Sequence, residues 1–188
     1  MTGNTLNMHY TIADPKTFGI SEYEPVLPIY HSDQPEDSKE HCSDLLHRLD
    51  RIDPDRLSPE NAYTYRLLHR SLENDLALAD FPYYNEPLSP SSGMQSQLPV
   101  LLAEYTFRTK RDVTDYLALL DQIDDYFASL LLYEQEKAAA GFFMPACSSE
   151  KVRKQCDTIV TTEELAQGTH FLQTTFEDRL SELQKQGL

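Results

Sequence analysis

One regularly spaced set of apolar residues constrains the fold of this chain more than any other feature. Large apolar side chains recur at alternating steps of three and four residues, at Val113, Tyr116, Leu120, Ile123, Phe127 and Leu130. This period places them on one face of an α-helix. Thr109 and Asp112 have the spacing of a capping box, and Gly141 is suited to end a helix. The sequence therefore predicts one long helix from the cap at Thr109 to about residue 140.

Weaker signals of the same kind predict further helices. Ser58 followed by Pro59 is typical of an N-cap with proline at the first helical position. Thr161 and Glu164 have the spacing of a second capping box. Pro99 is expected either to precede the helix that contains it or to bend it. The expected ranges are 35–52, 59–80, 94–107, 149–160 and 161–186, with a loop over 81–93.

The first 34 residues lack a helical period. Residues 5–12 alternate between apolar and polar side chains, with Leu6, Met8, Tyr10 and Ile12 on one side, so they predict one short strand at most. Proline and glycine interrupt regular structure from there to about residue 35. We therefore expect an all-α protein with five to six helices in an irregular bundle. Residues 1–34 form an extended arm, and residues 35–188 form a single helical domain.

Charge and composition exclude several classes of function. The 188 residues contain 31 Asp and Glu against 16 Lys and Arg, which gives a net charge of −15. Such a chain is a poor partner for nucleic acid or an anionic membrane surface, because both require clustered positive charge. No run of 18 apolar residues predicts a membrane span, and the first 30 residues do not resemble a signal peptide. The sequence as written predicts a cytoplasmic protein with reduced cysteines, although a longer parent could be exported.

The common catalytic motifs are absent from the sequence. Each of the six histidines is followed by a residue other than Glu, so the zinc-binding H-E-x-x-H pattern does not occur. Ser148 and Lys151 match the S-x-x-K spacing, but a helix cap explains the serine more simply. Neighbouring glycines are at least 16 positions apart, which excludes phosphate-binding glycine loops. We therefore predict no catalytic residue in this chain.

Three groups of polar residues could in principle hold a metal ion. One contains His41, Cys42 and Asp44, another contains Asp121, Asp124 and Asp125, and the third is Asp53-Pro54-Asp55. A solvated helix face explains the first two groups better, and a turn between helices explains the third. The sequence therefore predicts neither a metal site nor another cofactor in this chain.

Several segments resemble one bacterial family. They are LNMHYTIADP at 6–15, FGI at 18–20, EPLSPSSGMQSQLPVLLAEYTFR at 86–108, DVTDYL at 112–117 and YEQEKAAAG at 133–141. Together they resemble the family known as domain of unknown function 885. The similarity extends over nearly the whole chain.

The resemblance implies that this chain corresponds to the amino-terminal helical portion of a longer, zinc metallopeptidase-like protein. The H-E-x-x-H-type motif of such proteins lies downstream of the segments quoted above. The expected function is thus a non-catalytic module that forms part of a cleft wall, with zinc bound elsewhere in the parent. Its expected partner is the remainder of the parent, or a second copy of the chain. Both a truncated chain and a natural short protein fit this expectation.

Six residues around the proline-rich loop are candidates for binding a peptide substrate, because they combine aromatic faces with hydrogen-bonding groups. They are Tyr83, Tyr84, Gln95, Glu104, Tyr105 and Arg108. Ordinary helix packing is the competing explanation for Tyr105 and its neighbours. A second functional hypothesis is an independent acidic scaffold that binds a basic partner or peptide.

Overall fold

The computed structural model describes residues 3–30, 34–185 and 187, and no strand occurs among them. The chain is therefore all-α, as predicted. Its contacts form two compact units, one comprising Met1–Ile29 with Glu86–Leu188 and the other comprising Tyr30–Asn85. The predicted division at residue 34 stays a prediction. No helix in the described ranges is long and apolar enough to cross a membrane.

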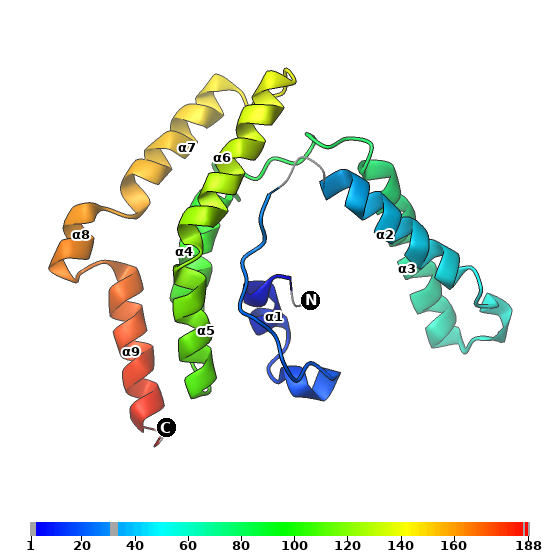
Figure 1. The fold of residues 1–188 in the computed structure, drawn as a ribbon, viewed down its shortest axis with the longest axis horizontal. Helices are drawn as coiled ribbons and strands as arrows, with labels where there is room; N and C mark the ends of the chain where they lie inside the picture. The colour runs from blue at the N-terminus through cyan, green and yellow to red at the C-terminus, as the bar shows by residue number, and fades with distance from the viewer. Residues whose placement is uncertain (1–2, 31–33, 186, 188) are drawn as a thin grey trace. The chain divides into compact units, whose positions relative to one another are not determined.

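The Tyr30–Asn85 unit is a helical hairpin. Helix α2 (Gln34–Leu49) packs against α3 (Pro59–Leu78), and a short 3₁₀ helix (Pro54–Arg56) lies in the connection between them (Figure 1). The backbone N–H of Asn61 donates to Ser58 Oγ over 3.3 Å, which confirms the predicted N-cap of α3. The helices enclose an apolar groove of about 330 Å³ lined by Leu45, Arg48, Leu49, Ile52, Leu68 and Leu72.

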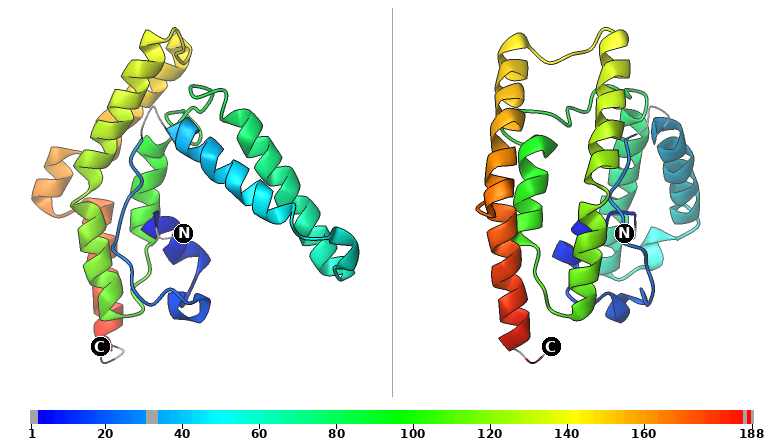
Figure 2. Two further views of the ribbon diagram at one scale, coloured as in Figure 1. Left: turned by 45° about the vertical axis from the view of Figure 1, so that its right-hand side comes forward. Right: turned by 60° about the vertical axis from the view of Figure 1, so that its left-hand side comes forward.

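Most of the other unit consists of six helices between residues 94 and 185. They are α4 (Met94–Glu104), α5 (Lys110–Leu120), α6 (Ile123–Ala139), α7 (Ala146–Ile159), α8 (Thr162–Gln167) and α9 (Phe171–Lys185). Helix α4 packs against α7 and α9, and α6 continues beyond α5 (Figure 2). Pro99 lies within α4, which begins at Met94. An aromatic cluster of Tyr105, Phe107, Tyr116 and Phe176 occupies the core between these helices.

The predicted single helix over 109–140 is wrong in one respect, because it is interrupted at Asp121 and Gln122. The Gln122 backbone has φ −95° and ψ −2°, which ends α5 and starts α6. The Gln122 side chain is held at this break by three hydrogen bonds. Its Nε2 donates to the carbonyls of Pro25 and Ala118, both at 2.9 Å, and its Oε1 accepts from Leu27 N–H at 3.0 Å. The apolar period continues across the break, which is why the sequence predicts one helix.

The predicted helix over 161–186 is also interrupted. Gly168 has φ +69°, a left-handed conformation that favours glycine, and it closes the short helix α8. The buried side chain of His170 then begins α9: its Nδ1 accepts from Leu172 N–H at 3.3 Å, and its Nε2 lies 2.9 Å from the Ile159 carbonyl. The described residues therefore form more helices than the five to six predicted.

The predicted strand over residues 5–12 is wrong, because Thr5–Thr11 form helix α1. Asn4 caps this helix by accepting from Asn7 N–H at 3.0 Å. The buried positions Thr5, Met8, His9 and Ile12 follow a helical period that the alternation of apolar residues conceals. A short 3₁₀ helix (Pro15–Phe18) follows, closed by Gly19 at φ +75°.

Beyond this turn, residues 20–30 lie outside any helix, and their backbone is paired without a sheet. Thr5 holds Val26 through two hydrogen bonds: its N–H donates to the Val26 carbonyl at 2.9 Å, and its Oγ1 accepts from Val26 N–H at 2.8 Å. The amide of Gln122 pairs the flanking Pro25 carbonyl and Leu27 N–H. The arm is thereby fixed beside α5, where it forms one wall of a cleft.

Candidate functional site

The first turn of α5 is built by the predicted capping box. The Asp112 Oδ2 atom accepts from Thr109 N–H at 2.6 Å and from Arg108 N–H at 2.9 Å, while Thr109 Oγ1 accepts from Asp112 N–H at 3.4 Å. These bonds satisfy backbone donors that a helix start would leave unpaired. They also fix the backbone of Arg108, and with it the point from which the Arg108 side chain extends.

His9 of α1 lies against this turn. Its ring stacks on the ring of Tyr105, with centres 3.7 Å apart and planes 12° apart, and its Nε2 lies 3.5 Å from Arg108 Nη1. Burial, reinforced by the Arg108 guanidinium, lowers the pKa of His9 below its ordinary value, although Asp112 acts in the opposite direction. The imidazole is therefore neutral at neutral pH, and its 3.8 Å contact with Asp112 is not an ion pair there.

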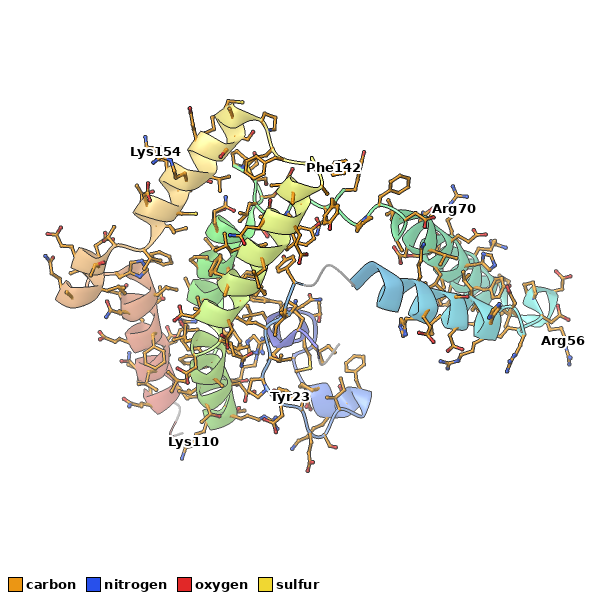
Figure 3. The ribbon with its side chains drawn as sticks, turned by 45° about the horizontal axis from the view of Figure 1, so that its top comes forward. Tyr23, Arg56, Arg70, Lys110, Phe142 and Lys154 are labelled. Atoms are coloured by element: carbon orange, nitrogen blue, oxygen red, sulfur yellow. The ribbon has the colours of Figure 1, made fainter. Side chains whose placement is uncertain are left out.

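A second set of contacts joins the arm to α5 one turn further on. The hydroxyl of Tyr23 donates to Asp115 Oδ2 at 2.8 Å, and Arg111 Nε lies 3.4 Å from the same oxygen. The Arg111 guanidinium stacks 4.0 Å above the Tyr23 ring, and its Nη2 donates to the Tyr23 carbonyl at 2.8 Å. Burial, followed by the bond to Asp115, raises the pKa of Tyr23 to about 12. Figure 3 shows Tyr23 beside α5.

These two sets of contacts border a cleft of about 550 Å³ between the arm and the start of α5. We call it the arm cleft. Its walls consist of Ala13, Asp14, Pro15, Lys16, Ile20, Ser21, Tyr23, Arg108, Thr109, Arg111 and Asp112. Three of these side chains are cationic and two are carboxylates, and Asp115 pairs with Arg111 beside them, so the cleft lacks the negative excess of this strongly acidic chain.

Comparison with known proteins places the chain in a family. The family model described as "Bacterial protein of unknown function (DUF885)" matches residues 16–187. The chain belongs to this family. Neither curated proteins nor solved structures give a match to it. The family match covers the arm cleft from Lys16 onward, whereas His9 and the residues up to Pro15 precede it.

The six substrate-binding candidates of this DUF885 chain are divided between its two units, and the four in the unit of residues 86–188 do not form one group. Tyr105 and Arg108 both contact His9, whereas Gln95 lies at the other end of α4. Tyr83 and Tyr84 belong to the Tyr30–Asn85 unit. Gln95 and Tyr105 are buried, as the packing explanation expects, and Tyr84, Glu104 and Arg108 are exposed. Only Arg108 of the six lines the arm cleft.

Sequence reasoning did not identify the other polar residues of the arm cleft. Arg111 and Asp115 have the i,i+4 spacing of a helical ion pair, and this spacing could have indicated them. Lys16 and Tyr23 carry no comparable signal, because they are about ninety positions away from α5 in the sequence. No group of three His, Cys, Asp or Glu side chains that could hold a metal ion occurs in the part of the chain that the structure describes.

A separate buried cluster lies along α6. The carboxylate of Glu134 is 6% exposed, and neither of its oxygens has a hydrogen-bond partner among the described residues. The buried Lys137, one turn away, forms an ion pair with Glu86. Burial raises the pKa of Glu134 above its ordinary value, and the nearby Glu86 adds to this effect while Lys137 opposes it. The charged form of Glu134 is therefore costly in the folded state.

Replacing this carboxylate is expected to stabilise the protein in a pH-dependent way. Because the pKa of Glu134 is raised on folding, its contribution to stability is most favourable in acid and is lost as the pH rises through the folded-state pKa. Glu134→Gln should raise the free energy of unfolding by about 1 kcal/mol at pH 8, and the gain should shrink towards pH 4. Urea unfolding across this range measures the difference. The exposed neighbour Glu136→Gln is the control, and an equal, pH-independent effect of both changes would contradict the prediction.

Proposed function

We propose that this chain is a non-catalytic helical module of a zinc metallopeptidase-like protein in the DUF885 family. In this proposal the metal and the catalytic base belong to another part of the longer protein, and the present helices pack against that part. Membership of the family supports the proposal. The observation that carries it is an apolar surface on α6 and the turn that follows.

Four large apolar side chains on α6 and in the turn that follows are more than half exposed. Leu131 and Leu132 on α6 are 59% and 60% exposed, and Phe142 and Phe143 just beyond the helix are 57% and 58% exposed (Figure 3, Phe142). Isolated exposed apolar residues are normal, but two adjacent pairs within 13 positions favour a surface that is covered by other protein. We refer to these four residues as the α6 apolar surface.

The sequence supports the non-catalytic part of the proposal. None of its histidines has the H-E-x-x-H context in which two imidazoles one turn apart hold zinc and a glutamate acts as the base. Zinc in this proposal is a cofactor of the longer protein, and no chemical step is assigned to the residues described above. Among the six candidate residues, the exposed Tyr84, Glu104 and Arg108 are the ones free of core packing for contact with a peptide.

Zinc content and peptide hydrolysis test the non-catalytic role. The purified chain, dialysed against a weak chelator, is expected to hold far less than one zinc ion per molecule and to leave peptide substrates intact. Metal analysis and a hydrolysis assay measure both properties. Retention of one zinc per chain, together with hydrolysis that disappears on zinc removal, would overturn the proposal.

Docking tests the role of the α6 apolar surface directly. The chain is expected to bind a separately produced H-E-x-x-H-containing portion of a longer family member. The double substitution Leu131→Glu and Leu132→Glu should abolish this complex, because it buries two charges without partners. Leu117→Glu, at a 46% exposed position on α5, serves as the control and should leave binding unchanged. Binding that survives the double substitution would contradict the assignment of this surface.

A second candidate function is an independent acidic module that binds a basic partner. Its support is the net charge of −15 and the exposed carboxylates Asp121, Asp124 and Asp125 at the junction of α5 and α6. Association driven by such charge slows steeply as salt is added, whereas docking through the α6 apolar surface does not. The salt dependence of complex formation therefore discriminates between the two functions.

A further inference from the structure

The arm cleft differs from the rest of the molecule in its charge. Lys16, Arg108 and Arg111 line it, against the two carboxylates Asp14 and Asp112. Asp115 pairs with Arg111 in the wall of the cleft, so three positive charges stand against three negative ones there, in a chain whose net charge is −15. An anion that approaches this acidic protein is therefore repelled less at the arm cleft than elsewhere.

Arg108 keeps most of its hydrogen-bonding capacity. Within the described ranges, its guanidinium makes one polar contact, the 3.5 Å approach of Nη1 to His9 Nε2. The neutral imidazole does not compensate the positive charge, and Asp112 directs Oδ2 towards backbone N–H groups. Donors on the planar guanidinium therefore remain for a ligand, and their geometry matches the two oxygens of a carboxylate.

Arg111, in contrast, is held in place. Its Nε lies beside Asp115, its Nη2 donates to the Tyr23 carbonyl, and its plane stacks on the Tyr23 ring. This arrangement fixes the guanidinium of Arg111 in the wall of the cleft. Because the side chain is already ordered, ligand binding costs less conformational entropy. The arm that carries Tyr23 is itself anchored by Gln122 and Thr5.

From this arrangement we infer that the arm cleft binds a carboxylate attached to a small apolar group, with Arg108 as the principal partner of the carboxylate. The apolar part of the ligand contacts Ala13, Pro15 and Ile20, which line the same cleft. The inference concerns binding by this chain alone, so it does not depend on the proposed function.

The charges of the cleft favour a carboxylate over phosphate. Inorganic phosphate carries between one and two negative charges at neutral pH, and Asp14 and Asp112 would repel the charge beyond the first. A carboxylate carries one negative charge, which matches the single charge of Arg108, whose guanidinium contacts no carboxylate among the described residues. The apolar wall also offers a phosphate ion no contact, whereas it removes an alkyl group from water.

N-acetylleucine is a suitable probe, and N-acetylleucinamide is its uncharged counterpart. In a buffer without carboxylate or phosphate, NMR titration of the chain with N-acetylleucine should give a dissociation constant on the order of 1 mM. The amide should bind at least about tenfold more weakly, because it lacks the charge-assisted bonds. Inorganic phosphate should not displace N-acetylleucine at equal concentration.

Substitutions then identify the partner of the carboxylate. Arg108→Ala should weaken N-acetylleucine binding about tenfold or more, and Lys16→Gln should weaken it a few-fold while leaving packing intact, since Lys16 is exposed. Arg153→Ala, an exposed arginine on α7, is the matched control and should bind as the unaltered chain does. Equal affinity for acid and amide, tighter binding of phosphate, or unchanged binding in the Arg108 variant would each overturn the inference.

Discussion

Gly93→Ala is expected to lower the free energy of unfolding by about 3 kcal/mol, the upper end of the usual cost of overpacking. A Cβ atom at this position would lie 2.3 Å from Ser89 N, 2.5 Å from Ser89 O and 2.0 Å from Gln95 Oε1. Backbone atoms cannot move aside as a flexible side chain can, so the loop or the start of α4 must shift. The Gly93 backbone has φ −74°, so space and not conformation requires glycine here.

Thermal unfolding followed by circular dichroism measures this effect, and the melting temperature should fall by roughly 6–12 °C. Gly3→Ala is the matched control, because a Cβ there meets no atom within 4 Å and its melting temperature should stay the same. If the two alanine variants melt together, then the close approach of Gly93 to Ser89 does not constrain the fold.

Arg179→Ala is expected to have an effect of similar size. The Arg179 Nη1 atom donates to the Leu102 carbonyl at 3.0 Å and also to the Tyr105 carbonyl, both at the end of α4. Among the described residues, the Leu102 carbonyl accepts one backbone bond, a long one of 3.4 Å from Tyr105 N–H, so Arg179 supplies a partner that the helix end lacks. The guanidinium also lies over the rings of Phe107 and Tyr116, 4.9 and 5.2 Å from their centres. Loss of these contacts should reduce the free energy of unfolding by about 3 kcal/mol.

Urea unfolding tests this prediction with a graded series. Arg179→Lys keeps the positive charge but not the planar fork, so it should recover only part of the lost stability. Arg153→Ala removes an exposed arginine from α7 and should be nearly neutral. A loss of less than about 1 kcal/mol on Arg179→Ala would show that α9 and α4 are joined by apolar packing alone.

Most of the correct sequence-based predictions concern local interactions. The N-caps at Ser58, Thr109 and Thr161 were predicted correctly, because each depends on residues within one helical turn. The cap expected near Ser148 is wrong, because α7 already begins at Ala146. The break at Gln122 was missed, because its cause is a pair of bonds to Pro25 and Leu27, almost a hundred positions away. The break after Gly168 was missed although glycine is a local signal, since the apolar period continues beyond it.

The candidate site follows the same division. Arg108 was singled out as a peptide-binding candidate because it flanks the proline-rich loop and carries hydrogen-bonding groups, and the pairing of Arg111 with Asp115 could have been inferred from their i,i+4 spacing. The contributions of Lys16, Tyr23 and His9 depend on the way the arm folds back onto α5, which no spacing in the sequence encodes. The arm cleft as a whole therefore becomes visible only in three dimensions.

The pairing of the extended arm has a consequence for the behaviour of the protein in concentrated solution. An extended segment normally presents free N–H and C=O groups on which a strand of another molecule can assemble. Here Thr5 occupies both backbone groups of Val26, and the amide of Gln122 occupies the neighbouring carbonyl of Pro25 and N–H of Leu27. Neither the start of α1 nor a single glutamine side chain can continue a β-ladder. The backbone groups of residues 25–27 that they occupy therefore offer no template for intermolecular β-pairing.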